Sequence, residues 1–315
     1  MREKVVAIIG PTAVGKTRLS IETSLAFNGE VISGDSMQVY KGLDIGTAKV
    51  IRDEMKGVPH HLIDIKEPAE PFSAAEFQEE VTGLISTINN RGRLPVLAGG
   101  TGLYIQAVLF GYQFADAVSD EVYRKELEQK AEAEGPESIH KELAAVDPDS
   151  AGRIHPNNLR RVIRALEIHR TTGKTMTEYH MEQTNESPYD YVLIGLEMDR
   201  GVLYRRINER VDLMIEQGLF AEVKRLYDSG LRDAQSVQAI GYKEIFDYFD
   251  GKAGYEEAIE NLKQNSRRYA KRQFTWFRNK MDVEWFDMTP VAEGNAPFDE
   301  VKNEIFEYIA GKLNV

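Results

Sequence analysis

The first hundred residues alternate between short apolar runs and amphipathic segments, a pattern typical of strands and helices in turn. Residues 5–9 (VVAII), 30–34 (EVISG) and 94–98 (LPVLA) are apolar runs with the length and composition of buried strands. The segment 61–65 (HLIDI) is a further strand candidate. Strands that alternate with helices predict a parallel sheet with crossover helices.

Helical periodicity fills the segments between these strands. Residues 17–27 and 102–111 predict helices that directly follow strands. Ser73 and Glu76 have the spacing of a capping box, and the helix they predict ends around residues 89–92. Each strand is thus followed by the helix that a crossover connection needs.

The pattern of residues changes near residue 115, where charged segments with helical spacing begin and continue to residue 190. Residues 191–198 (YVLIGLEM) and 283–286 (VEWF) return to the strand pattern. The sequence therefore predicts an α/β core domain that carries an inserted, all-helical subdomain. We expect the core to comprise residues 1–114 and 191–315, and the insertion to comprise residues 115–190.

Composition narrows the functional classes. With 315 residues, 42% of them apolar, the chain can bury a sizeable core. Its 39 basic and 51 acidic residues give a net charge of −12, which by itself argues against a polyanionic partner. The absence of cysteine excludes disulfides and thiolate chemistry. The first apolar run is too short for a signal peptide or a membrane span, so we expect a cytoplasmic protein.

Residues 10–17 (GPTAVGKT) match the phosphate-loop pattern G-x-x-x-x-G-K-[ST] between a strand and a helix, which predicts a sheet of the P-loop NTPase type. Backbone N–H groups of such a loop form an anion cradle, to which Lys16 adds a charge, and the Thr17 hydroxyl is placed to ligate Mg²⁺. An ordinary glycine-rich turn is the weaker alternative. The residues that match the pattern are Gly10, Gly15, Lys16 and Thr17.

The residues that follow the other strands indicate which reaction a phosphate bound at the loop takes part in. An NTPase usually carries a metal-binding aspartate after a second strand, but residues 94–98 lead into Gly99, Gly100 and Thr101. Asp35 instead follows strand 30–34 and should face the same crevice. It could remove a proton from a nucleophile, and its polar neighbours could read the edge of a base.

Two enzymatic interpretations of Asp35 stay open at this point. One is a small-molecule kinase with Asp35 as the base, and the other is transfer of a different group away from a bound diphosphate. A solvated turn is the alternative for Gly34, Asp35 and Ser36. Arg206 and Arg210 share a helix face, which suits a diphosphate clamp or a solvated surface equally.

Two segments concentrate positive charge. Residues 153–174 carry six basic residues against Glu167 alone, and residues 263–280 (KQNSRRYAKRQFTWFRNK) carry seven and no acidic residue. Basic side chains interleaved with aromatic ones suit a nucleic-acid backbone and exposed bases. For either helix alone a solvated basic face is the more common explanation, but two such clusters in an acidic chain favour binding.

Seven segments resemble the tRNA dimethylallyltransferase (tRNA isopentenyltransferase) family. In order they are GPTAVGKT, SGDSMQVYKGLDIGTAK, PHHLIDI, GGTGLY, RIHPNNLRRVIRALE, AIGYKEI and AKRQFTWFR. The resemblance runs from residue 5 to about residue 280 and is more specific than the phosphate loop. It implies transfer of a dimethylallyl group from dimethylallyl diphosphate to the N6 amine of the adenosine 3′-adjacent to the anticodon in tRNA, with release of diphosphate.

The resemblance also implies residue roles. The phosphate loop would bind the diphosphate of the prenyl donor, with Mg²⁺ near Thr17, and Asp35, Thr101 and Arg210 would be catalytic. The diphosphate-binding residues that this implies are Gly10, Thr12, Ala13, Val14, Gly15, Lys16 and Thr17. The anticodon stem-loop would be held by the insertion, as a clamp, and by the second basic helix. Together with the basic faces, this gives the expected tRNA-binding residues Asp35, Ser36, Met37, Gln38, Thr101, Arg124, Arg160, Arg161, Arg164, Lys271, Arg272 and Arg278.

Some alternatives to this function remain. An adenylate isopentenyltransferase acting on free nucleotides shares the loop and the aspartate, although the basic insertion favours tRNA. A P-loop kinase and a non-catalytic RNA-binding module are the others. Eukaryotic members often add a C-terminal zinc finger, whereas this cysteine-free chain ends at Val315 and resembles the bacterial form. We expect a monomer.

Overall fold

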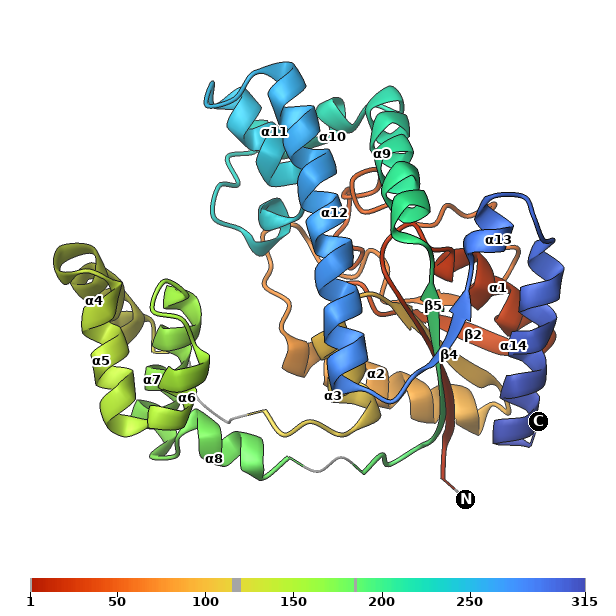
Figure 1. The fold of residues 1–315 in the computed structure, drawn as a ribbon, viewed down its shortest axis with the longest axis horizontal. Coiled ribbons are helices and arrows are strands. Elements are labelled where there is room, and N and C mark those ends of the chain that lie inside the picture. The colour runs from red at the N-terminus through yellow and green to blue at the C-terminus, as the bar shows by residue number, and fades with distance from the viewer. Residues whose placement is uncertain (1, 115–119, 184–185, 315) are drawn as a thin grey trace. The chain divides into compact units, whose positions relative to one another are not determined.

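The structure is a computed structural model that describes residues 2–114, 120–183 and 186–314 (Figure 1). The chain divides into two compact units. Residues 1–109 and 187–315 form the core unit, and residues 110–186 form the helical unit. The boundary expected at residue 115 lies outside the described residues.

The core unit is built on one six-stranded sheet in the order β3-β2-β4-β1-β5-β6. Every pairing in it is parallel, which confirms the predicted α/β fold. Central strands of such a sheet are buried on both faces, and β1 is buried from its second residue to its last. The strands are β1 Lys4–Ile9, β2 Gly29–Ser33, β3 His60–His61, β4 Leu94–Gly99, β5 Asp190–Glu197 and β6 Glu284–Asp287.

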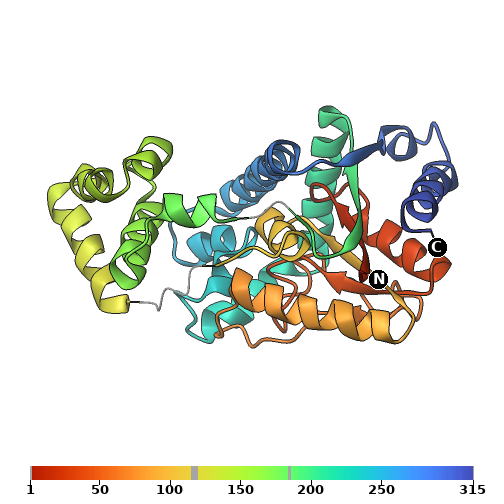
Figure 2. The same ribbon diagram turned by 90° about the horizontal axis from the view of Figure 1, so that it is seen from below.

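Helices cover both faces of this sheet. α1 and α14 lie on one face, where they share a hydrophobic core with Val6 and Ile8 of β1, and α2 lies on the other (Figure 2). Ser73 and Glu76 form the predicted capping box of α2. The helices are α1 Lys16–Ala26, α2 Ala74–Asn90, α3 Gly102–Leu109, α9 Arg200–Glu216, α10 Leu219–Asp228, the 3-10 helix η1 Gln235–Gln238, α11 Tyr242–Phe249, α12 Tyr255–Lys280, α13 Thr289–Ala292 and α14 Phe298–Leu313.

The strand predicted at 61–65 is wrong in extent. The observed strand β3 consists of His60 and His61 only. Leu62 and Asp64 have φ angles of 61° and 55°, a left-handed backbone that cannot continue a strand. His61 lies 2.6 Å from a carboxylate oxygen of the buried Glu30, in keeping with a structural role for the histidine pair.

The helical unit has a hydrophobic core of its own, to which α4, α5 and α7 contribute Leu127, Leu143 and Leu166. No helix in the described part of the chain is long and apolar enough to cross a membrane. The helices of this unit are α4 Glu121–Glu134, α5 Pro136–Val146, α6 Pro148–Arg153, α7 Leu159–Thr172 and α8 Met176–Met181.

Candidate active site

The phosphate loop connects β1 to α1 with a strongly curved backbone. Gly10, Ala13 and Gly15 all have positive φ angles, of 142°, 67° and 115°. A Cβ atom on Gly10 would lie 2.6 Å from the carbonyl oxygen of Leu196 in β5, so only glycine fits there. The loop thus brings backbone N–H groups to the N-terminus of α1, where an anion binds favourably.

Three cationic side chains converge on this loop. The Lys16 ammonium donates to the carbonyl oxygens of Gly10 and Pro11, at 2.9 and 2.7 Å. From α9, Arg206 donates to the carbonyl oxygen of Ala13 at 3.1 Å, and Arg210 donates to the Thr12 hydroxyl at 3.4 Å. The structure therefore supports the clamp interpretation of these two arginines.

These three cations lack a carboxylate partner. Among the described residues, Lys16, Arg206 and Arg210 form no ion pair with an aspartate or glutamate. Burial, together with the nearby charge of Arg210, lowers the pKa of Lys16 to about 7. Burial and the neighbouring Arg206 also lower the pKa of Arg210. A bound multivalent anion would relieve this repulsion.

Asp35 follows β2 and lies on the same edge of the sheet. Its Oδ1 atom accepts hydrogen bonds from the backbone N–H groups of Met37 and Gln38, at 2.8 and 3.3 Å. Burial raises the pKa of Asp35, an effect opposed by those two bonds and by the charge of Lys16. A carboxylate with a raised pKa is a stronger base than an exposed one.

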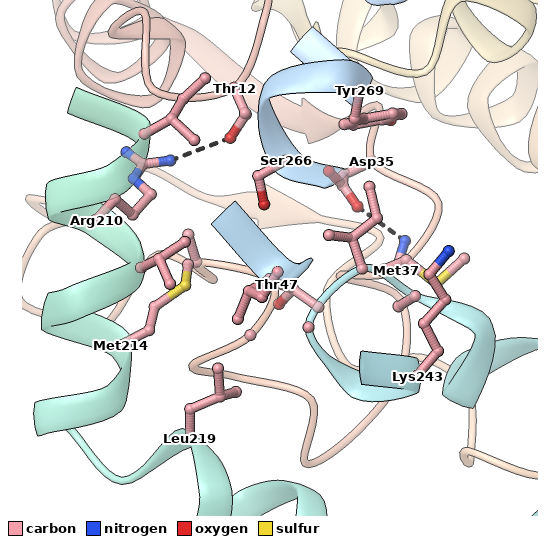
Figure 3. Close-up of a pocket in the computed structure, with 18 of the residues that line it drawn as sticks. Thr12, Asp35, Met37, Thr47, Arg210, Met214, Leu219, Lys243, Ser266 and Tyr269 are labelled. Atoms are coloured by element: carbon pink, nitrogen blue, oxygen red, sulfur yellow. Dashed lines mark hydrogen bonds between the residues drawn. The ribbon is translucent and has the colours of Figure 1, made fainter. Parts of the chain in front are cut away.

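A cavity of about 330 Å³ is lined by both Asp35 and Arg210 (Figure 3). Thr12, Arg210 and Tyr269 contribute polar groups at one end, while Met214 and Leu219 from α9 and α10 form an apolar wall (Figure 3). This wall was not foreseen. Its trace in the sequence is the apolar spacing of Ile207, Val211 and Met214 on α9, which also suits an ordinary core-facing helix. The remaining apolar residues of the wall include Ile207, Val211 and Leu262.

The buried side chain of Gln273 on α12 connects two strand ends, a role that sequence reasoning also missed. It accepts a hydrogen bond from the Thr12 N–H and donates one to the Gly100 carbonyl oxygen, both at 3.0 Å. A Cβ atom on Gly100 would lie 2.0 Å from Nε2 of Gln273, so the glycine lets α12 approach β4. This contact explains the glycine-rich turn before Thr101 that the sequence analysis singled out.

Thr101 and Tyr269 lie beside this junction. The Thr101 hydroxyl is buried and has no hydrogen-bond partner of standard geometry among the described residues. The pKa of Tyr269 is raised to about 12 by burial and by the negative charge of Asp35. A buried hydroxyl without a well-aligned partner is a group that a substrate could satisfy.

A model of the IPP transferase family matches residues 38–280 of this sequence. The chain belongs to this family. The tRNA dimethylallyltransferases of Geobacillus thermodenitrificans and Bacillus subtilis are 62% and 59% identical to it over 315 and 314 residues. Each alignment covers 100% of this chain and 99% of the relative. The seven sequence motifs predicted a resemblance to tRNA dimethylallyltransferases of the bacterial type, and these relatives confirm that prediction.

Solved structures agree with this family assignment. The full-length tRNA isopentenylpyrophosphate transferase from Bacillus halodurans is 58% identical, with a TM-score of 0.76 over 99% of this chain and 97% of that chain. A eukaryotic dimethylallyltransferase acting on tRNA is 34% identical, with a TM-score of 0.82 over 95% of this chain and 77% of that chain. The fold is therefore shared by bacterial and eukaryotic IPP transferases.

In this IPP transferase, the basic residues expected to bind tRNA fall into two groups. Arg124 and Arg164 both bind the fully buried carboxylate of Glu167, with nitrogen to oxygen distances of 2.7 and 2.6 Å. Arg278 similarly pairs with Glu197. The exposed side chains free of ion pairs within the described ranges are Arg160, Arg161, Lys271 and Arg272.

The expected tRNA-binding residues that follow β2 also have two kinds of surroundings. Ser36 and Met37 line the cavity with Asp35. Gln38 is occupied elsewhere: its side chain accepts a hydrogen bond from the Ser33 hydroxyl at 3.0 Å and donates one to the Thr47 carbonyl oxygen at 3.2 Å. The structure thus places Gln38 as a support for the cavity wall.

Proposed function

We propose that this protein transfers a dimethylallyl group from dimethylallyl diphosphate to the N6 amine of the adenosine 3′-adjacent to the anticodon in tRNA, releasing diphosphate. The observation that carries the proposal is the cavity: its lining combines Arg210, which forms no ion pair with a described residue, the carboxylate of Asp35 with its raised pKa, and an apolar wall. The relatives are tRNA dimethylallyltransferases and tRNA isopentenylpyrophosphate transferases, which supports tRNA as the acceptor and a prenyl group as the group transferred.

The donor would bind with its diphosphate on the phosphate loop. The loop N–H groups, Lys16 and Arg210 would hold the phosphate oxygens, and the apolar wall around Met214 and Leu219 suits the dimethylallyl chain. As the bond from carbon to diphosphate oxygen breaks, negative charge builds on the leaving group. The cations around the loop would stabilise that charge more strongly in the transition state than in the ground state.

Asp35 would act on the acceptor. The lone pair of an adenine N6 amine is delocalised into the ring and is therefore a weak nucleophile. In the proposed step N6 forms a bond to C1 of the dimethylallyl group, the carbon–oxygen bond to diphosphate breaks, and Asp35 takes the proton that N6 loses. The buried Thr101 hydroxyl could complete the contacts with the base.

The residues at the loop fit Mg²⁺ held mainly by diphosphate oxygens and water. Thr17 is exposed in the first turn of α1, where its hydroxyl can be a ligand. No cluster of three or more aspartate, glutamate or histidine residues suitable for a metal occurs in the described residues, so the protein supplies few ligands of its own. When bound, the ion would offset charge on the departing diphosphate.

Asp35 lines a cavity in the core unit, and an adenine that is still stacked in the RNA cannot enter a cavity. The adenine must therefore leave its stack to reach Asp35. We infer that Arg272 and Lys271 on α12 contact the RNA backbone near the cavity, since Arg272 also lines it. Arg160 and Arg161, exposed on α7 of the helical unit, are the complementary candidates for the anticodon stem.

The test is incubation of the purified protein with radiolabelled dimethylallyl diphosphate, Mg²⁺ and one acceptor at a time. The acceptors are unmodified tRNA and the free nucleotides AMP, ADP and ATP. Label in tRNA alone is the expected result. Label in free nucleotides would instead indicate an adenylate prenyltransferase, and an absence of label in every acceptor would overturn the proposal.

A further inference from the structure

Glu222 of α10 is a buried carboxylate that plays no part in the chemistry described above. Its side chain is bound by four donors and is 2% exposed. Oε2 accepts from the backbone N–H groups of Asp44 and Ile45, at 3.0 and 2.8 Å, and Oε1 accepts from the N–H of Gly46 at 3.1 Å. The Tyr242 hydroxyl donates to Oε1 at 2.6 Å.

The number and type of these partners require a carboxylate. Glu222 forms no ion pair with a described residue, so its charge is stabilised by N–H and O–H groups alone. An ionised carboxylate has four acceptor sites and no donor, which matches four donors. The amide of glutamine would turn an NH₂ group toward some of those donors and leave them unsatisfied.

The segment that Glu222 holds is a wall of the catalytic cavity. Gly46, Thr47 and Ala48 line that cavity together with Asp35. The ring of Tyr242 lies against Gly46, where a Cβ atom would be 2.5 Å from the ring. Glu222 and Tyr242 therefore hold residues 44–46, directly before Thr47, which Figure 3 shows at the cavity.

A chain of hydrogen bonds leads from this wall to Asp35, the proposed proton acceptor. The Thr47 carbonyl oxygen accepts from the side chain of Gln38 at 3.2 Å. The backbone N–H of Gln38 in turn donates to Oδ1 of Asp35 at 3.3 Å. The orientation of the Asp35 carboxylate is thus connected to Glu222 through Thr47 and Gln38.

We propose that Glu222 is a positioning residue that orients Asp35 and the 44–48 wall for the acceptor base, without contacting either substrate. This role rests on the proposed function. It concerns the acceptor side of the cavity and not the donor side, because none of the hydrogen bonds between described residues joins Glu222 to Lys16, Arg206 or Arg210. A defect at Glu222 should therefore act on the reaction with the amine and spare diphosphate binding.

The experiment compares Glu222→Gln with the wild-type full chain in single-turnover prenylation of tRNA and in binding of inorganic diphosphate. We expect the single-turnover rate to fall at least tenfold, with the dissociation constant of diphosphate unchanged within twofold. The acid limb of the pH–rate profile should also move to higher pH, because Asp35 loses hydrogen bonds that hold its pKa down.

Two further variants guard against a purely structural explanation. Asp147→Asn removes a comparably buried carboxylate that accepts from the N–H groups of Ser150 and Thr177 in the helical unit. It should lower Tm but leave the prenylation rate and its pH profile unchanged. Tyr242→Phe removes one of the four donors to Glu222, should show a smaller rate defect of the same kind, and carries the test if Glu222→Gln does not fold.

The outcomes separate this role from the proposed function. A wild-type protein that labels no tRNA overturns the proposed function, and the role of Glu222 with it. An active wild type with a Glu222→Gln variant of equal rate overturns the positioning role alone. So does a rate loss in Glu222→Gln that Asp147→Asn reproduces at the same loss of Tm, or a parallel loss of diphosphate affinity.

Discussion

Two groups of basic side chains differ in whether a carboxylate of the protein pairs with them. Around the phosphate loop, Arg206 donates to a backbone oxygen and Arg210 to a hydroxyl, and Lys16 donates to two carbonyl oxygens. In the helical unit, Arg124 and Arg164 share the fully buried carboxylate of Glu167. The first group thus has no salt-bridge partner among the described residues, whereas each arginine of the second is paired with a carboxylate of the protein.

The difference shows which charges are available to a ligand. A cation without a carboxylate partner in a partly buried site costs stability until an anion binds, whereas a paired cation contributes to the fold. Removing charge from the catalytic cavity should therefore reduce function and spare stability. Removing charge from the Glu167 cluster (Arg124, Arg164 and Glu167) should reduce stability first.

The largest effect is expected for Asp35→Asn. The prenylation rate should fall on the order of 10²- to 10⁴-fold, the range for loss of a general base. The stability of the folded protein, by contrast, should stay the same or rise. The pKa of Asp35 is raised by burial, so the folded state binds the proton more tightly and its charged form destabilises the fold above the usual pKa of 3.8.

Thermal unfolding checks the stability half of that prediction. At pH 7 the Tm of Asp35→Asn should equal or exceed that of the wild type, and the advantage should shrink as the pH falls toward 4 and below. A variant that loses activity together with several degrees of Tm at pH 7 would show that Asp35 is structural.

Glu167→Gln tests the opposite half of the comparison. It leaves Arg124 and Arg164 facing a neutral amide at a buried position. Because both arginines are about one-third exposed, we expect a loss of about 2–3 kcal/mol in the free energy of unfolding, less than for a fully buried pair. Urea unfolding measures it. A loss below about 0.5 kcal/mol, the level of an ordinary surface substitution, would contradict the structural role.

Arg210→Ala should weaken binding of inorganic diphosphate by about 10- to 100-fold, the value of a charged hydrogen bond of about 1.5–3 kcal/mol. Its Tm should not fall, since burial and the charge of Arg206 disfavour the charged Arg210. Arg124→Ala is the matched control, with unchanged diphosphate affinity and reduced stability. Calorimetric titration distinguishes the two, and equal affinities for both variants would remove Arg210 from the site.

The pH dependence of diphosphate binding should report Lys16, which faces Arg210 and Asp35. Its pKa in the free protein is lowered to about 7, and a bound anion should raise it. Affinity is then greatest below pH 7 and falls by up to about tenfold per unit as the pH rises above that value. Lys16→Met is the control, because it retains the titration of diphosphate itself and should lack this additional slope.

The smallest effect is expected for the double variant Arg160→Ala, Arg161→Ala. Both side chains are exposed and form no ion pair with any residue that the structure describes, so they are available to phosphates. Loss of two phosphate contacts should reduce the slope of log affinity for tRNA against log salt by about 1.5 and leave Tm unchanged. An unaltered slope would mean that these arginines form only a solvated face.

Much of the core unit follows from local patterns. The strands at the start of the chain, the capping box at Ser73 and the phosphate loop are encoded over a few residues each, because burial on both faces selects apolar runs and helix ends select specific caps. The strand predicted at 61–65 was wrong because the positive φ of Leu62, a residue that ordinarily avoids it, leaves no local signal.

The sequence by itself therefore determined the parallel α/β fold, the phosphate loop and, through seven motifs, the family. Only the tertiary structure decided which arginines are neutralised, that Gln273 connects the phosphate loop to β4, and that Glu222 holds the wall beside Asp35. The reason is physical: caps, turns and strand patterns depend on neighbours along the chain, whereas most of these contacts join groups far apart in the sequence, from 43 residues for Arg124 and Glu167 to 261 for Thr12 and Gln273. The pair of Arg164 and Glu167 is the local exception, three residues apart on α7.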